Sequence, residues 1–148
     1  MQTHITNSFE ETQSLGEILA KQIIKNGPDN SAVVLGLQGN LGGGKTTFLQ
    51  GFAKGLGIKE KILSPTFVIL KHFKITNSKF SDFYHIDCYR IGKPEEILEL
   101  DFKEIILNPK NIVTIEWSEK IEKFLPKSTA FIEFEFVDES QRKIVINL

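Results

Sequence analysis

The stretch Gly39-Asn40-Leu41-Gly42-Gly43-Gly44-Lys45-Thr46-Thr47 fits the phosphate-loop pattern G-x-x-x-x-G-K-[ST], with Gly39, Gly44, Lys45 and Thr46 at the fixed positions. An apolar run rich in β-branched residues precedes it at 32–37, which predicts a buried strand. Apolar residues then recur at helical spacing over 48–56, until glycines end the pattern. The motif therefore has the strand before it and the helix after it that a phosphate loop requires.

The residue types of this stretch suit the binding of a nucleotide phosphate. Glycines let the backbone turn its N–H groups inward without Cβ clashes, and the N-terminus of the following helix adds a positive dipole end. Lys45 supplies a charge for the β and γ oxygens, and the Thr46 hydroxyl suits Mg2+. The alternative, a glycine-rich turn that binds nothing, is disfavoured by the full match and both flanks. The predicted nucleotide-binding residues here are Gly39, Leu41, Gly42, Gly43, Gly44, Lys45, Thr46 and Thr47.

The size and composition predict one soluble domain over residues 1–148. The chain has 41% hydrophobic and 25% charged residues, and no apolar run approaches the roughly 20 residues that a membrane span needs. A leader with a basic head and an apolar core is absent, so we expect a cytoplasmic protein without membrane contact. The single cysteine, Cys88, cannot form an internal disulfide. A net charge of −1 without a basic stripe predicts no strong unaided binding of nucleic acid.

The remaining patterns predict an α/β fold, namely a P-loop NTPase-like three-layer sandwich with a mixed central sheet and a C-terminal antiparallel hairpin. Ser8 and Glu11 form a capping-box pattern that predicts a helix over 10–25. The segment Ser64-Pro65-Thr66 reads equally well as a phosphate-facing switch loop or as the entry to a strand. Strands are predicted at 67–75, 80–86, 112–115, 130–137 and 143–148, the last two at one sheet edge, and short helices at 93–100, 102–107 and 118–125.

Two carboxylates follow predicted strands: Asp87 after the strand at 80–86, and Glu116 after the strand at 112–115. Ligands in open α/β sheets collect at the C-terminal ends of parallel strands. Both side chains would therefore face one site if their strands run beside the loop at Gly39. Solvated charges at the strand ends are the alternative for each residue taken alone.

Some functional classes are disfavoured by what the sequence lacks. The N-K-x-D pattern that reads guanine is absent, which argues against a Ras-like GTPase. Only two arginines occur, so a catalytic arginine would be Arg90 or would come from another protein, and we expect slow intrinsic ATP hydrolysis. A small-molecule or nucleoside kinase is the main alternative. Such a kinase closes an arginine-bearing lid over its substrate, and two arginines are few for such a lid. A nucleotide-gated binding module is a third possibility.

The order of several motifs closely resembles the bacterial TsaE (YjeE) family along nearly the whole chain. The motifs are Glu11-Thr12 with Leu15-Gly16, the loop Gly39–Thr47, Ser64-Pro65-Thr66, Tyr84-His85-x-Asp87-x-Tyr89-Arg90, Glu95-Glu96 and Glu116-Trp117. Two positions depart from the family's usual residues: Asn40, often Asp, and Gly43, often Ala. Neither departure removes a phosphate or metal ligand.

The resemblance implies an ATP- and Mg2+-dependent ATPase that works with TsaB and TsaD proteins to form N6-threonylcarbamoyladenosine at position 37 of tRNA. Contact with tRNA would be indirect, through that complex, and ATP hydrolysis would reset the complex between turnovers. By motif position, Lys45 would bind phosphates and Asp87 would serve hydrolysis, as the two catalytic residues. Thr46 and Glu116 would hold Mg2+, Thr12 would lie near the adenine, and Trp117 would lie close to the nucleotide. A core aromatic position is the alternative for Trp117.

Overall fold

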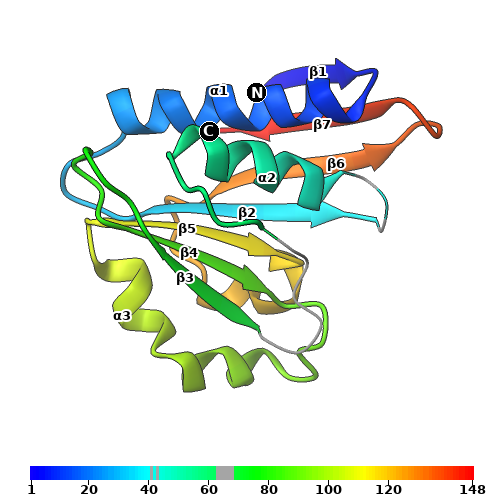
Figure 1. The fold of residues 1–148 in the computed structure, drawn as a ribbon. Helices are drawn as coiled ribbons and strands as arrows, with labels where there is room; N and C mark the ends of the chain where they lie inside the picture. Colours follow the sequence, from blue (N-terminus) through cyan, green and yellow to red (C-terminus); the bar gives the residue numbers. More distant parts are fainter. Residues whose placement is uncertain (41, 43, 63–68) are drawn as a thin grey trace.

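The computed structural model describes residues 1–40, 42, 44–62 and 69–148, and seven strands within these residues form one mixed sheet (Figure 1). The strands are β1 (Gln2–Thr6), β2 (Val33–Gly39), β3 (Leu70–Lys74), β4 (Asp82–Asp87), β5 (Asn111–Glu116), β6 (Ala130–Phe136) and β7 (Arg142–Asn147). Their order is β1-β7-β6-β2-β5-β4-β3. The central strands β6, β2, β5 and β4 are parallel, so their carboxyl ends meet at one edge of the sheet.

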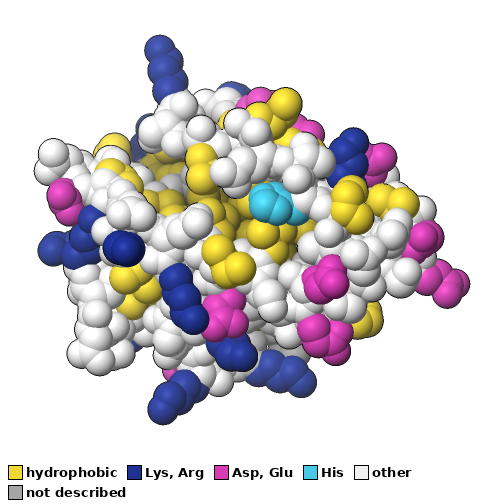
Figure 2. Space-filling view, turned by 90° about the horizontal axis from the view of Figure 1, so that it is seen from above, with side chains coloured by type: hydrophobic (Ala, Val, Ile, Leu, Met, Phe, Trp, Pro, Cys, Tyr) yellow, Lys and Arg dark blue, Asp and Glu magenta, His cyan; other side chains and the backbone are white. Residues whose placement is uncertain are grey.

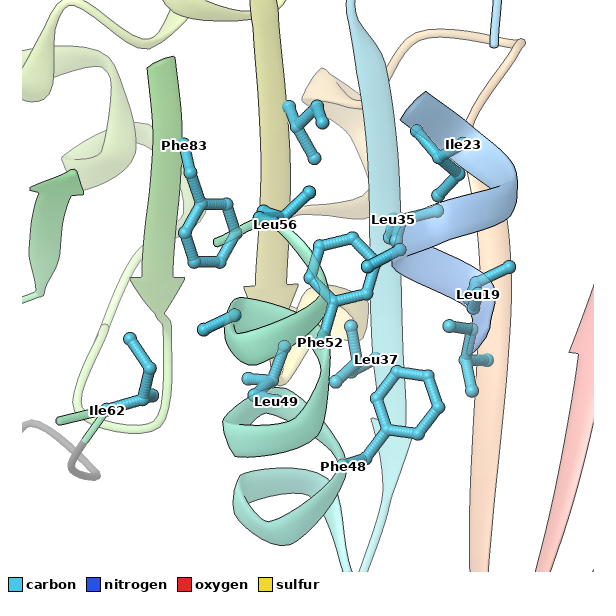
Figure 3. Packing of buried hydrophobic residues seen from close by; sticks show 14 of the residues in the cluster. Leu19, Ile23, Leu35, Leu37, Phe48, Leu49, Phe52, Leu56, Ile62 and Phe83 are labelled. Carbon is cyan, nitrogen blue, oxygen red and sulfur yellow. The ribbon is translucent and has the colours of Figure 1, made fainter. Parts of the chain in front are cut away.

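Helices pack on both faces of this sheet (Figure 1). They are α1 (Phe9–Asn26), α2 (Lys45–Gly55), α3 (Phe102–Leu107) and the 3-10 helices η1 (Pro94–Leu100) and η2 (Ser118–Phe124). One buried cluster lies under α1 and α2 (Figure 3). Within it, Phe48 meets Phe134 edge-on, with ring centroids 5.4 Å apart. A second cluster lies under η1, α3 and η2 on the other face. None of the helices in the described residues is long and apolar enough to cross a membrane.

The two helices on the first face touch through their backbones. A Cβ added to Gly51 of α2 would lie 1.9 Å from the carbonyl oxygen of Gln13 in α1, and one added to Gly16 would lie 2.2 Å from that of Phe48. Only glycine permits so close an approach. Ser8 caps α1 as predicted, with its Oγ accepting a 3.1 Å hydrogen bond from the Glu11 N–H. The glycine contacts hold α1 beside α2, and the cap fixes where α1 begins.

The C-terminal strands form the predicted antiparallel hairpin, but its predicted place at the sheet edge is wrong. The strand β1 pairs antiparallel with β7 and occupies that edge instead. Its sequence, Gln2–Thr6, is mostly polar and gives little strand signal by itself. It is a strand in the fold because it pairs with β7. The pair predicted at 67–75 and 80–86 is antiparallel as β3 and β4, while residues 67 and 68 lie outside the described part of the chain.

Candidate functional site

The loop between β2 and α2 lies at the carboxyl edge of the parallel strands. Gly39, Gly42 and Gly44 have φ angles of +129°, +78° and +100°, in the range that favours glycine. Gly39 is also confined by space, because a Cβ there would lie 2.1 Å from the carbonyl oxygen of Phe134 in β6. Any side chain at position 39 would therefore push the loop away from the sheet.

The first turn of α2 presents backbone N–H groups toward this loop. Its N-cap is Gly44, which has no side chain to accept a hydrogen bond from those groups. A helix N-terminus of this kind favours an anion through its free N–H groups and its dipole. Thr46 and Thr47 are half-buried in the same turn, whereas Leu41 and Gly43 lie outside the residues that the structure describes.

Lys45 is buried at the start of α2 and is held on two sides. Its Nζ donates a 2.5 Å hydrogen bond to the Gly39 carbonyl oxygen and lies 3.9 Å from the ring centroid of Trp117. Burial lowers the pKa of Lys45, and the negative charges of Glu116 and Asp87 partly offset this effect. The ammonium group therefore lies within the loop, close to both predicted carboxylates.

The register of the sheet brings those two carboxylates side by side. Asp87 at the end of β4 pairs with Glu116 at the end of β5, and Glu116 pairs with Leu37 of β2. Both acids are buried. Glu116 Oε2 lies 2.7 Å from Nε2 of His85, and Asp87 Oδ1 accepts a 2.9 Å hydrogen bond from the Tyr89 N–H. Strand β5 thus runs beside the strand that leads into the loop, and β4 runs beside β5. This is the arrangement under which Asp87 and Glu116 are expected to face one site.

The chemistry of these oxygens fits a divalent cation. Burial raises the pKa of Asp87; the Tyr89 hydrogen bond opposes that rise, and the charge of Glu116 adds to it. A cation between the two acids would relieve that unfavourable charge, and hydroxyl and carboxylate oxygens are ligands that Mg2+ accepts. Within the described residues, no group of three or more His, Cys, Asp and Glu side chains is arranged to hold a metal.

Trp117 follows Glu116 in a left-handed backbone conformation, with φ at +57° and ψ at +42°. This conformation is uncommon for a bulky residue. The half-buried indole packs at the margin of the second core cluster and lies 5.3 Å, centroid to centroid, from the ring of Tyr89. The ring thus lies at the core margin and also contacts Lys45. A core aromatic position is therefore compatible with the expected position close to the nucleotide.

We expect the fluorescence of Trp117 to change when Mg-ATP binds, because phosphates would draw the Lys45 ammonium away from the indole. Trp117 is the only tryptophan, so emission reports on this position alone. An emission titration compared with calorimetry on the same sample checks this, and Trp117→Phe should lose the signal. Calorimetric saturation with constant emission would place the nucleotide away from the indole.

A cavity of about 260 Å³ opens beside the start of α2. Thr12 is buried at its wall, where its Oγ1 lies 2.7 Å from that of Thr6, and a Cβ added to Gly44 would lie 3.6 Å from Thr12 Cγ2. The cavity therefore adjoins the phosphate loop. Its lining residues are Asn7, Ser8, Phe9, Glu10, Thr12, Gly44, Thr47, Glu139, Ser140 and Arg142.

Two residues beside the site were not predicted from the residue pattern. His85 precedes Asp87 by two positions, a spacing that puts both side chains on one face of a strand and could have pointed to it. Arg142 lines the cavity, with its guanidinium carbon 4.7 Å from the ring centroid of Phe136 and Nη1 donating to the carbonyl oxygens of Asp138 and Gln141. Only the hairpin brings Arg142 there, so no local signal could have found it.

Comparisons with known proteins agree on one family. The family model described as "Threonylcarbamoyl adenosine biosynthesis protein TsaE" matches residues 6–144. The chain is similar to proteins named tRNA threonylcarbamoyladenosine biosynthesis protein TsaE from Rickettsia felis, with 39% identity over 93% of this chain and 75% of the relative. The homologue of that name in Treponema pallidum is 32% identical over 96% of this chain and 97% of its own.

A solved structure supports the same grouping. The crystal structure of YdiB from Bacillus subtilis superposes with a TM-score of 0.71 at 30% identity, covering 98% of this chain and 83% of the other. The sequence relatives and this structural neighbour both cover nearly the whole chain. With the family model matched from residue 6 to residue 144, the chain belongs to the TsaE family.

Proposed function

We propose that this chain is a Mg2+-dependent ATPase, a single P-loop domain over residues 1–148, that serves the formation of N6-threonylcarbamoyladenosine at adenosine 37 of tRNA. The observation that carries the proposal is the sheet register, which aligns Asp87 with Glu116 beside the strand that leads into the phosphate loop. The helices on both faces of a sheet with four parallel central strands support a P-loop NTPase-like layering. The family and its relatives' names supply the pathway.

ATP would lie along the start of α2. The glycine-rich loop and the N-terminus of α2 would bind the phosphates, with Lys45 reaching the β and γ oxygens from its place at Gly39. The adenosine would enter the neighbouring cavity beside Thr12 and Thr47. Thr12 is buried and Thr47 is half-buried, and both line this cavity, so Thr12 would contact the nucleoside and Thr47 the phosphates.

Glu116 and Asp87 would have different roles in ATP hydrolysis. Thr46 and Glu116 would hold Mg2+, which supplies charge neutralisation at the phosphate oxygens when bound. Asp87 would orient the attacking water, because its Oδ1 is fixed by the Tyr89 N–H at the end of β4. Lys45 would stabilise the charge that develops on the transferred phosphoryl group.

We infer that TsaB- and TsaD-like partners in the cytoplasm bring this ATPase to tRNA, and that hydrolysis resets the complex. Lys and Arg side chains share the face seen in Figure 2 with many acidic ones, and apolar side chains gather at its centre. Mixed charge of this kind favours contact with tRNA through partners over strong binding by the chain alone. Arg142 is engaged with hairpin carbonyl groups, which supports a partner as the source of a catalytic arginine.

The protein alone should hydrolyse ATP slowly, and a TsaB–TsaD-like complex with tRNA should raise its turnover. The physical reason is that a positioned arginine stabilises the transition-state charge and can raise the rate by about 10³-fold or more. Phosphate release measured with and without the partners tests this. Equal rates in both conditions would contradict stimulation, and phosphate transfer to an added nucleoside or small metabolite would favour the kinase alternative.

A further inference from the structure

We propose that His85 is the positioning residue for Glu116 and, through it, for the divalent cation of the site; this inference rests on the proposed function. His85 lies on β4 in register with Thr114 of β5, and β5 separates β4 from β2, the strand that leads into the phosphate loop. Its Nε2 lies 2.7 Å from Oε2 of Glu116. The imidazole is fully buried and Glu116 is 3% exposed, so this contact is shielded from water.

The contact fixes the carboxylate in one orientation. An ionised carboxylate only accepts hydrogen bonds, so Nε2 of His85 is the donor. A buried carboxylate without such a donor is strongly disfavoured and would turn toward water or another cation. Because the bond uses Oε2, the other carboxylate oxygen stays available as a metal ligand. Groups that hold ligands in this way tune the affinity for the metal.

Folding stability does not account for a histidine at this place. Within the described residues, its Nδ1 is buried without a hydrogen-bond partner, and the same is true of Thr114 Oγ1 on the paired position. An unsatisfied buried nitrogen destabilises the fold, so an apolar side chain would suit this position better if packing were its only role. The polar contact that the described residues give this imidazole is the one to Glu116.

The second acid of the site is held by a different group. Asp87 Oδ1 accepts from the Tyr89 N–H, a backbone donor that a change at His85 leaves in place. A variant at His85 should therefore alter the role of Glu116 while the hydrogen bond that fixes Asp87 remains. Such a variant should change the cation concentration that the site requires, without changing the affinity for the nucleotide itself.

The test compares His85→Leu, which removes the donor, with His85→Gln, whose amide nitrogen reaches the position of Nε2. The Mg2+ concentration at half-maximal ATP binding is measured by calorimetry, and Mn2+ binding in the presence of a non-hydrolysable ATP analogue by electron paramagnetic resonance. We expect His85→Leu to need about 10- to 100-fold more cation. ATP affinity in EDTA should stay within a few-fold of the parent, and His85→Gln should restore the cation midpoint.

A matched control is available on β3. His72 Nε2 lies 2.6 Å from Asp82 Oδ1, which is the same kind of pair at an exposed place away from the site, so His72→Leu should leave the cation midpoint unchanged. A folded His85→Leu with the parent's midpoint would overturn the inference. Equal impairment of the Leu and Gln variants would also overturn it, because packing alone would then explain both.

Two further variants keep the test decisive. If His85→Leu fails to fold, His85→Asn replaces it, since its shorter amide cannot reach Glu116; equal midpoints for the Asn and Gln variants would overturn the inference. Glu116→Gln is measured in parallel. An unchanged midpoint in Glu116→Gln would refute the metal assignment of the proposed function itself. A raised midpoint there, together with an unchanged one in His85→Leu, would refute only the role of His85.

Discussion

Lys45→Ala is expected to abolish ATP hydrolysis, with a loss of about 100-fold or more, and to weaken ATP binding. The variant removes a buried ammonium group whose Nζ is fixed by the Gly39 carbonyl oxygen and lies within the phosphate loop. Water that fills the space left by the side chain cannot supply the lost positive charge at the β and γ oxygens. Single-turnover phosphate release and calorimetric titration of ATP measure the two effects separately.

Lys54→Ala is the matched control for this experiment. Lys54 lies near the C-terminal end of the same helix, and its side chain is 77% exposed, with a 3.9 Å ion pair to Glu17. An exposed pair of this kind contributes little to stability, so the control should bind and hydrolyse ATP as the parent does. If Lys45→Ala keeps the parent's affinity and turnover, the phosphate-loop assignment is wrong.

Asp87→Ala and Glu116→Ala should fail in different ways, although the two residues are paired in the sheet. We expect Asp87→Ala to bind Mg-ATP within a few-fold of the parent and to lose about 100-fold or more in hydrolysis, because orienting water matters mainly in the transition state. Glu116→Ala should chiefly raise the Mg2+ requirement and weaken Mg-ATP binding. Nucleotide titrations at several Mg2+ concentrations and single-turnover hydrolysis decide between these behaviours.

Asp87→Asn separates chemistry from local structure at this position. An asparagine retains an oxygen that accepts from the Tyr89 N–H, so the turn after β4 should persist while the carboxylate charge is lost. Asp87→Asn should therefore match the alanine variant in hydrolysis. Recovery of turnover with asparagine would show that Asp87 serves the turn, and loss of Mg-ATP affinity in Asp87→Ala but not in Glu116→Ala would reverse the two assignments.

The parts of the fold that could be predicted are those with a local signal. The capping residues Ser8 and Glu11 locate the start of α1, and the glycines with the following lysine locate the junction of β2 and α2. The aliphatic run that ends at Glu116 is a buried strand, as its composition indicates. Asp87 and Glu116 could be predicted as neighbours because parallel strands end at the same edge of a sheet.

The parts that could not be predicted depend on contacts between distant segments. Strand β1 exists because β7, some 140 positions along the chain, supplies its pairing partner, so Gln2–Thr6 alone gives no clear pattern. Arg142 reaches the cavity beside the start of α2 only through the β6–β7 hairpin. The contact of His85 with Glu116 requires that β4 and β5 be neighbours in a particular register, which no spacing within either strand encodes.

The glycine contact between α1 and α2 limits the width of the cavity beside the start of α2, where the adenosine is proposed to bind. Thr12 and Gly16 are four residues apart on α1, as Thr47 and Gly51 are on α2, so each pair lies on one face of its helix. The two threonines line the cavity, and the two glycines bring the helices into backbone contact one turn further along. The two glycines do not line the cavity, yet their contacts fix the distance between the helices that form its walls. The size of the base that the proposed site accepts would therefore depend on atoms that the base does not contact.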